Sequence, residues 1–385
     1  MTVAYRFPRV ILLAACALLF FCYILNSFYG KRAATELSTP SAVKSQLKSK
    51  YTPHHAEREI ERSLDDITNT TLGFNRVFAI GLKDRMDKRD AMTIGTSLTN
   101  IDLEWVEGVR LAEMSDKSHP ASWKEREDSL PELAAWRAHM NVLQKIVAEK
   151  IPTALVFEDD IDWDVTIKAQ LKQFARGARA LQKSHRPPLH HSSRVYVIPD
   201  DPTVAPSTNR IGHEIVQFQL PGKNMETTRF VLDYADVPCS LAYGITYEAA
   251  LRTLTKWSLE PNSQPFDNDL RELCDPTNSL SNHGFFLRCI APYPLLFGHY
   301  RKEGPAAAGS DIREMGSTWQ EAHSHGIVFS TMLNAKGLLT GATTTAKAQY
   351  AGCEPQEIDF KNIELPRGYL YSHNETDNGI RKIRN

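Results

Sequence analysis

A dense run of carboxylates marks the residues of this sequence that are best suited to chemistry. Five acidic side chains fall within the seven positions 158–164, namely Glu158, Asp159, Asp160, Asp162 and Asp164. They follow the apolar segment 154–157 directly, and that segment predicts a buried strand. In open α/β sheets, ligands bind beyond the carboxyl ends of the strands. Clustered carboxylates repel one another, and a hard divalent cation such as Mn²⁺ or Mg²⁺ offsets that repulsion.

The alternation of a strand gives these side chains different directions. It predicts Glu158 and Asp160 on one side of the chain and Asp159 on the other. The plainer interpretation of the same run is a solvated acidic turn that caps the next helix. The buried strand directly before the run favours a ligand site over that interpretation.

Three kinds of site are compatible with such a run. A calcium loop starting at Asp160 is excluded, because Val165 replaces the required Gly and Leu171 the bidentate Glu. Residues 162–166 resemble the DxDxT motif of the haloacid-dehalogenase phosphohydrolases, but that nucleophile should follow the apolar strand directly. A glycosyltransferase would hold a cation here that neutralises the diphosphate of a nucleotide sugar.

Alternating apolar and helical segments have to position these residues. Strands are predicted over 77–82, 101–106, 154–157, 194–198 and 241–246, and helices over 83–92, 130–150, 247–257 and from 265 to 273. The helix over 130–150 is the clearest, because Ser129 and Glu132 resemble a capping box and Pro152 ends it. Residues 290–297 are expected to be extended and 340–348 to form a loop. This order predicts an α/β fold with a largely parallel sheet.

Several segments, in the same order, resemble glycosyltransferase family 25, the bacterial lipopolysaccharide and collagen galactosyltransferases. They are Val77–Arg89, with Gly81 replacing the Asn of the family; Glu132–His139, which keeps the ends of E-[IL]-G-C-x-x-S-H; Leu155–Ile161; Ala242–Thr246; Pro265–Asp269, like "PxD"; and Ser310–Ile312. Ala134, Ala135 and Ala138 depart from the Gly, Cys and Ser of the second motif. The resemblance covers about residues 76–312.

The resemblance implies an α/β, GT-A-like, Rossmann-type nucleotide-sugar-binding domain, a UDP-sugar donor, Mn²⁺ (or Mg²⁺) and inversion at the anomeric carbon. It implies Glu158, Asp159 and Asp160 as metal ligands, Arg85, Arg89, Glu132, His139 and Asp311 as donor contacts, and Asp267 or, second, Asp269 as the general base. Inversion needs one such base to deprotonate the acceptor hydroxyl. The alternatives are a helix N-cap for Asp267, a solvated helix face for the arginines and a buried structural role for His139.

The N-terminus predicts a membrane anchor. Residues 10–25 contain no charge, and with residues 26–29 they make about twenty residues, which span about 30 Å of hydrocarbon as a helix. A cleaved signal peptide is the alternative. We therefore expect a cytosolic tail (1–9), a transmembrane signal anchor (10–29), a stem (30–75), a catalytic domain (76–315) and a C-terminal extension (316–385). The sequons at Asn69 and Asn374 favour a luminal body, in a single-pass type II protein of the Golgi or endoplasmic reticulum membrane.

The charge balance and the cysteines give information on the partners of the protein and on its disulfides. The 45 Lys and Arg residues balance 46 Asp and Glu residues, which argues against a partner such as a nucleic acid that binds a basic surface. Outside the anchor lie Cys239, Cys274, Cys289 and Cys353, which allow three pairings or stay free thiols. The leading hypothesis is a transferase of galactose from UDP-galactose onto a glycan or glycoprotein. The alternatives are a metal-dependent DxDxT phosphohydrolase and a catalytically degenerate sugar-binding protein.

Overall fold

The computed structural model places the described part of the chain in one compact unit, Ser63–Asn385. The described residues are 64–120, 123, 130–183, 194–210, 224–233, 239–260, 264–275, 286–313 and 315–372. The predicted tail, anchor and most of the stem lie outside them, as does the sequon at Asn374. No helix within the described ranges is long and apolar enough to cross a membrane.

The first sheet carries the acidic run. Its strands are β1 (Arg76–Gly81), β2 (Glu104–Glu107), β3 (Thr153–Glu158) and β7 (Ala242–Thr246), in the order β2-β1-β3-β7. β1 pairs in parallel with β2 and β3, whereas β7 is antiparallel to β3. The chain goes from β1 to β2 on one side and later to β3 on the other side of β1. This reversal makes the carboxyl ends of β1 and β3 a topological switch point, where α/β sheets bind ligands.

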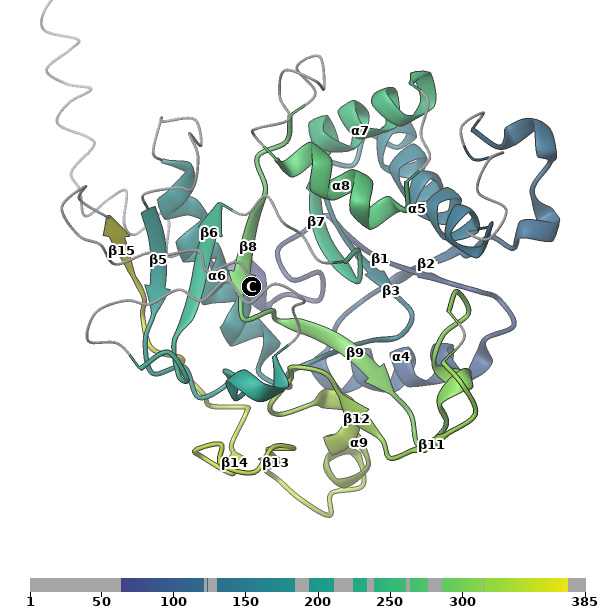
Figure 1. Cartoon of the computed structure of the whole chain (residues 1–385). Helices are drawn as coiled ribbons and strands as arrows, with labels where there is room; N and C mark the ends of the chain where they lie inside the picture. The colour runs from purple at the N-terminus through teal and green to yellow at the C-terminus, as the bar shows by residue number, and fades with distance from the viewer. Residues whose placement is uncertain are drawn as a thin grey trace, which may run out of the picture. The chain divides into compact units, whose positions relative to one another are not determined.

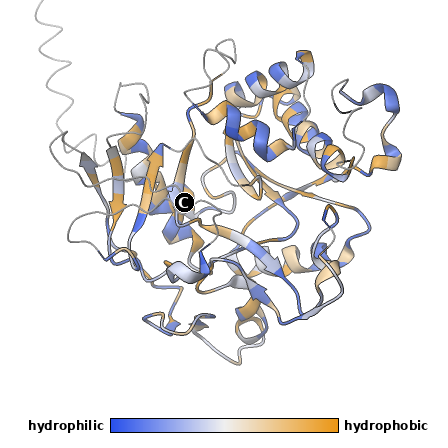
Figure 2. Cartoon of the chain, viewed as in Figure 1, coloured by the Kyte–Doolittle hydropathy of each residue, from blue (hydrophilic) through white to orange (hydrophobic). Residues whose placement is uncertain are grey.

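Helices cover both faces of this sheet. Figure 1 shows α4 (Met86–Thr99) on one side, with α5 (Leu130–Ala148), α7 (Tyr247–Leu259) and α8 (Phe266–Cys274) on the other. The helical spacing predicted for α5 is confirmed, because its apolar side chains are buried in one cluster with those of β1 and β3. The side chains of α5 in this cluster include Leu133, Trp136, Met140 and Leu143. Figure 2 shows apolar residues concentrated on the strands and alternating with polar ones around the helices.

A second sheet is entirely antiparallel and was not predicted. Its strands are β5 (Arg194–Ile198), β6 (Arg229–Asp233), β8 (Ile290–Tyr293) and β15 (Tyr369–Ser372), in the order β15-β5-β6-β8, and α6 (Ile167–Gln182) packs against it. The expectation of a largely parallel sheet therefore holds for β1, β2 and β3 only. A strand that follows a helix need not return to the same sheet, so the order of elements could not place residues 194–198.

The remaining elements tie the C-terminal part to the acidic run. They are β4 (Ile161–Trp163), β9 (Phe297–Arg301), β10 (Gly304–Pro305), β11 (Trp319–Gln320), β12 (His323–Ser324), α9 (Thr331–Leu339), β13 (Ala346–Lys347) and β14 (Glu357–Ile358), with 3₁₀ turns η1 (Asp66–Thr68), η2 (Leu111–Glu113), η3 (Asp116–Ser118), η6 (Ser207–Asn209) and η8 (Ala306–Gly309). β9 pairs with both β4 and β12, and α9 packs against α4. Residues 316–372 thus fold onto the rest of the same compact unit.

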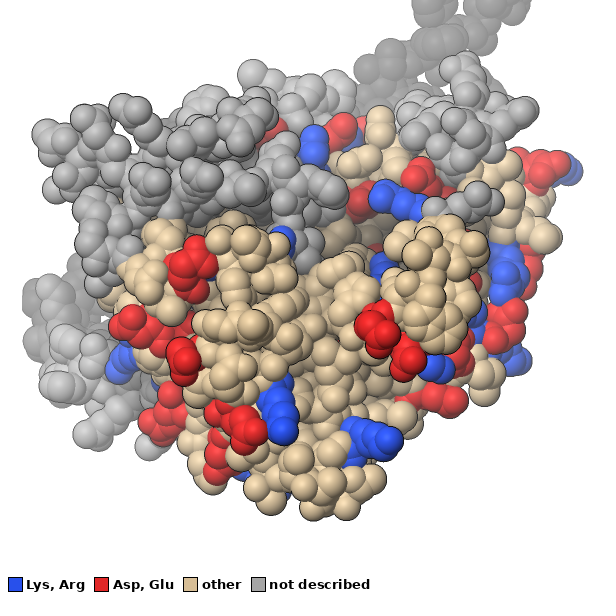
Figure 3. Space-filling view, turned by 60° about the horizontal axis from the view of Figure 1, so that its bottom comes forward, with Lys and Arg blue, Asp and Glu red and all other residues tan. Residues whose placement is uncertain are grey.

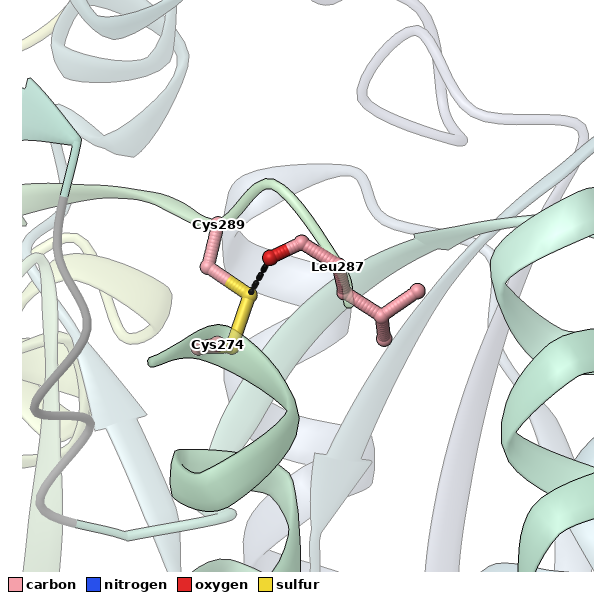
Figure 4. Close-up of a disulfide and its surroundings, with 3 residues drawn as sticks. All are labelled: Cys274, Leu287 and Cys289. Atoms are coloured by element: carbon pink, nitrogen blue, oxygen red, sulfur yellow. Dashed lines mark hydrogen bonds between the residues drawn. A yellow bond between two sulfur atoms is a disulfide. The ribbon is translucent and has the colours of Figure 1, made fainter. Parts of the chain in front are cut away.

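One disulfide fixes the end of α8. Cys274, the last residue of α8, is bonded to Cys289, directly before β8, and Cys289 Sγ lies 3.6 Å from the Leu287 carbonyl oxygen (Figure 4). Cys239 and Cys353 are free thiols. The sequence left three pairings and the unpaired state open, and the structure contains one of the possible bridges.

Surface charge is mixed on one face of this unit. On the face shown in Figure 3, acidic and basic side chains are interspersed among neutral ones. This distribution agrees with the formal net charge of −1 for the whole sequence.

Candidate functional site

The carboxylates at the end of β3 contact three different elements. Glu158 is the last residue of β3, and Asp159 and Asp160 form the turn into β4. Glu158 contacts α5, Asp159 contacts α4 and Asp160 contacts β9. Glu158 and Asp159 therefore point to opposite faces of the sheet, as strand alternation predicts. The alternation stops at the turn, so Asp160 does not share the direction of Glu158.

Glu158 belongs to a chain of polar contacts between α5 and β7. Its Oε1 accepts a hydrogen bond from Ser240 Oγ (2.6 Å) and lies 3.4 Å from His139 Nε2. His139 Nδ1 lies 3.1 Å from the Tyr243 hydroxyl, and its ring stacks on Phe266 with centroids 4.1 Å apart. Burial opposes the ionisation of Glu158, but the contacts with His139 and Ser240 hold its pKa below the usual range. At neutral pH the Glu158 carboxylate is thus an anion with a fixed orientation.

Asp159 pairs with a lysine of α4 and packs against the end of β1. Lys88 Nζ donates to Asp159 Oδ1 over 2.8 Å. Burial raises the pKa of Asp159 to about 6, although the Lys88 ammonium acts in the opposite direction. A side chain at Gly81 would start 2.6 Å from Asp159 Oδ2 and 2.9 Å from the ring of Trp105. Gly81, which replaces the Asn of the family, thus leaves room for Asp159.

Asp160 pairs with two cationic side chains of β9. Its Oδ2 accepts from Arg301 Nη1 over 2.6 Å and lies 3.4 Å from His299 Nδ1. Burial opposes the ionisation of both partners, but their contact lowers the pKa of Asp160 and raises that of His299 to about 9. His299 is therefore protonated at neutral pH, and Asp160 is neutralised by the protein itself.

Asp311 joins the N-terminal end of α4 to the loop after η8. Its Oδ2 accepts hydrogen bonds from both Arg85 and Lys88. Arg85 also donates to the Ala308 carbonyl oxygen over 2.7 Å. The hydroxyl of Ser310 accepts from two backbone N–H groups and so shapes the turn that presents Asp311. The structure therefore brings Arg85, Asp311 and Asp159 together, with Lys88 between the two carboxylates.

Two predicted donor contacts lie elsewhere. Arg89 donates to the carbonyl oxygen of Leu82 (3.2 Å) and to Glu107 (2.8 Å), and its guanidinium lies 4.3 Å from the centre of the Trp105 ring. These contacts join the ends of β1 and β2. Glu132 is half-buried in the first turn of α5, about 10 Å along the helix axis from His139.

The two candidate bases differ in exposure. α8 begins at Phe266 after Pro265, so Asp267 is not its N-cap; it is half-buried in the first turn. Its Oδ1 accepts only from the adjacent N–H of Asn268 among the hydrogen bonds described (2.9 Å). Asp269 is 5% exposed, on the inward side of α8. Asp267 is the more accessible of the two, and its neighbour Phe266 stacks on His139.

The described side chains do not fit a Mn²⁺ site as they stand. Within the described ranges, no three His, Cys, Asp or Glu side chains gather as a metal-binding group. Asp159 and Asp160 each have an oxygen in contact with a lysine or arginine, and Glu158 is shared by His139 and Ser240. Mn²⁺ or Mg²⁺ therefore remains a prediction of the family resemblance.

The last two carboxylates of the run are structural. Asp162 and Asp164 are each 1% exposed. Asp162 accepts from Ser330 Oγ and the Trp163 N–H, and Asp164 accepts from the hydroxyl and N–H of Thr166 and from Phe329 N–H (3.0 Å). A phosphoester cannot reach a nucleophile buried in this way, so the geometry disfavours the DxDxT hypothesis.

Sequence reasoning missed five residues of this region: Lys88, Ser240, Tyr243, His299 and Arg301. One signal was available, because Lys88 lies three residues after Arg85 and such residues share a helix face. No comparable signal exists for Arg301 or His299. They reach Asp160 because β9 pairs with β4, far away in sequence.

Comparison with known families supports the general activity. Residues 74–260 match the model of glycosyltransferase family 25 (LPS biosynthesis protein). The match confirms the resemblance to this family and indicates a glycosyltransferase, an activity that needs a nucleotide-sugar donor and an acceptor. The matched segment contains the acidic turn, Lys88 and His139, whereas Asp267, Arg301 and Asp311 lie beyond its end.

Proposed function

We propose that the protein transfers galactose from UDP-galactose to a hydroxyl group of a glycan or glycoprotein, with inversion at the anomeric carbon. The observation that carries this proposal is the set of charged side chains at the switch point between β1 and β3. Those strands lie within the segment that matches the transferase family. The donor sugar and the stereochemistry rest on the family resemblance.

Inversion requires a base that removes the proton of the acceptor hydroxyl while its oxygen attacks the anomeric carbon and the UDP leaves. Asp267 suits this role, because it is partly exposed at the start of α8. Its neighbour Phe266 stacks on His139, which contacts Glu158, so α8 is held next to the acidic turn. The buried Asp269 suits a structural role better.

The leaving UDP accumulates negative charge that the site has to stabilise. Lys88, Arg301 and His299 contact the acidic turn, and Arg85 lies beside Lys88 through their shared partner Asp311. The Mn²⁺ that the family resemblance implies stays a prediction, because Asp159 and Asp160 are already paired with Lys88 and Arg301 and do not fit a Mn²⁺ site as they stand.

We also propose a type II protein of the Golgi or endoplasmic reticulum membrane, anchored through residues 10–29. The disulfide between Cys274 and Cys289 supports this, because such bonds persist in the oxidising secretory pathway. Protease protection of the body in sealed microsomes, with loss of protection after detergent, tests the orientation.

The activity can be tested with the full chain in detergent and a panel of nucleotide sugars, with UDP release and acceptor labelling as readouts. We expect transfer from UDP-galactose. Asp267→Asn should lower kcat by about 100-fold or more while the affinity for UDP stays unchanged. Asp116→Asn, at the exposed turn η3, is the matched control.

Two results would refute the proposal. One is the absence of sugar transfer from every donor over a broad acceptor panel, which would indicate a sugar-binding protein. The other is release of phosphate from a simple phosphoester that Asp162→Asn abolishes, which would indicate a phosphohydrolase.

A further inference from the structure

The cationic side chains around the acidic turn form a group of their own: Arg85 and Lys88 at the start of α4, and Arg301 at the end of β9. We propose that these three side chains bind the diphosphate of the donor directly and that nucleotide binding needs no divalent cation. This inference rests on the proposed transferase function. It departs from the Mn²⁺ that the family resemblance implies.

The first support is that the protein already pairs Asp159, Asp160 and Asp311 with cationic side chains. Lys88 Nζ lies 2.8 Å from Asp159 and 3.0 Å from Asp311, and Arg301 Nη1 lies 2.6 Å from Asp160. A divalent cation on the same oxygens would lie next to an ammonium or a guanidinium group, and like charges at such distances repel strongly. Asp159 and Asp160 therefore already have cationic partners on the oxygens that a metal would need.

The second support is that Lys88 and Arg301 are largely desolvated and that the donors of Arg301 are not all used. The side chain of Lys88 is 12% exposed and that of Arg301 is 9% exposed. Arg301 Nε is buried and has no hydrogen-bond partner within the described part of the chain. Charge-assisted hydrogen bonds are stronger in such surroundings than in water. A buried guanidinium with an unused N–H group has capacity for an anionic ligand.

The third support is the way in which Asp311 is held. Its Oδ2 contacts both Arg85 Nη1 and Lys88 Nζ, so one anionic oxygen bridges two cations. A phosphate oxygen prefers the same arrangement. The Asp311 side chain is 31% exposed and comes from a loop, so it can leave without opening the core. We infer that Asp311 occupies this position until the diphosphate replaces it.

The backbone adds to the same site. Arg85 is the N-cap of α4, a helix of 14 residues, and its side chain does not cap the helix. The first N–H groups of a helix carry partial positive charge and bind phosphates readily. α4 follows β1, so its start lies at the switch point together with the acidic turn.

The test measures binding and not turnover. Full-length protein is titrated with UDP in EDTA and, separately, in Mn²⁺, by calorimetry and by thermal shift. We expect UDP to bind in EDTA with an affinity within about threefold of that in Mn²⁺. Lys88→Gln should weaken binding in EDTA by about tenfold or more, because it removes a charge-assisted contact. Asp311→Asn should strengthen binding by several fold, because the competing carboxylate loses its charge.

The control is a lysine–aspartate ion pair of similar length elsewhere, which is more exposed than that of Lys88. Lys172 Nζ lies 3.0 Å from Asp65 Oδ1, between α6 and η1, and Lys172→Gln should leave the affinity for UDP unchanged. If Lys88→Gln folds poorly, Asp311→Asn still decides the question, because its predicted effect has the opposite sign and its side chain is partly exposed.

Binding of UDP that requires Mn²⁺ would overturn the inference, as would an unchanged or weaker affinity in Asp311→Asn. In either case sugar transfer in the presence of Mn²⁺ would leave the transferase proposal intact. Binding in EDTA without any sugar transfer would support the inference and refute that proposal.

Discussion

Replacement of Gly81 by Ala tests the link between the end of β1 and the acidic turn. The Cβ atom of Ala would lie 2.6 Å from Asp159 Oδ2, 2.8 Å from Asp159 Cβ and 2.9 Å from Trp105 Cζ3. Real Cβ atoms hardly ever approach other atoms below 3.0 Å, so a neighbour has to move. The substitution therefore changes the position of a proposed site residue through packing alone.

A movement of either neighbour would weaken a contact that stabilises the fold. Asp159 is held by Lys88 at 2.8 Å, and Trp105 lies under the Arg89 guanidinium at 4.3 Å. Overpacking in a close-packed region lowers the free energy of unfolding by about 1–3 kcal/mol. Because both neighbours are held in place, we expect a loss in the upper part of this range, about 2–3 kcal/mol. For a unit of this size the melting temperature should fall by about 3–4 °C.

The assay compares thermal unfolding of full-length Gly81→Ala with that of Gly95→Ala, a control within α4. A Cβ at Gly95 would meet Met332 Sδ at 3.3 Å and Trp163 at 3.4 Å, which a flexible methionine can accommodate. Ala also favours a helix interior by about 1 kcal/mol over Gly. Gly95→Ala should therefore leave the melting temperature unchanged or raise it. Gly81→Ala should in addition weaken UDP binding, because Asp159 and Lys88 move.

The double variant Gly81→Ala/Asp159→Gly removes the two closest contacts and should recover about 1 kcal/mol relative to the sum of the single effects. A melting temperature of Gly81→Ala equal to that of the wild type would refute the packing argument. Strict additivity in the double variant would show that Asp159 is not the neighbour that resists the new methyl group.

Three further predictions concern stability. Burial raises the pKa of Asp162 to about 6 and of Asp164 to about 7, so both groups retain protons in the folded state that the unfolded chain releases. The contribution of Asp164 to the free energy of unfolding, taken as the difference between the wild type and Asp164→Asn in urea titrations, should therefore fall as the pH rises from about 4 to about 7, and a rise would contradict this. Arg229→Met should cost about 3–5 kcal/mol, because it leaves Asp201, its partner at 2.7 Å, buried and unpaired; a loss below 1 kcal/mol in the same assay would contradict it. Ser330→Ala removes a hydrogen bond to Asp162 and should lower the free energy of unfolding by about 1–3 kcal/mol. The affinity for UDP, measured by calorimetry, should stay unchanged, whereas weakened binding would assign Ser330 to the site.

The sequence identified the elements that have strong local patterns. The segment 194–198 matches β5, and the helix predicted over 130–150 corresponds to α5, Leu130–Ala148. Both segments carry apolar residues at regular spacing, and this pattern can be recognised from residues that are close together in the sequence. The antiparallel sheet was missed because its strands are brought together by pairings between residues far apart, such as Tyr196 with Leu370.

The candidate site shows the same limit. Asp159, Asp311 and Arg85 were selected from motifs, and the structure brings them together. Their common partner Lys88 was not selected, because its role depends on where the loop carrying Asp311 meets α4. Arg89 was selected from the same motif as Arg85, yet its side chain is used to join β1 and β2. A motif identifies the helix but not the direction of each side chain on it.

The acidic run itself illustrates why spacing alone could not assign a function. Its first three carboxylates lie at the end of a strand and in the following turn, where each contacts a different element. The last two lie in β4 and directly after it, and they hold residues 327–332 through Ser330 and the Phe329 N–H. A DxDxT pattern arises here because an aspartate that accepts bonds from the N–H and hydroxyl of a threonine two residues later is a common turn. The same residues that suggested a phosphohydrolase therefore connect the C-terminal segment to the candidate site. Residues 316–372 are consequently expected to be required for the geometry of that site, and a chain that ends at residue 315 should lose UDP binding.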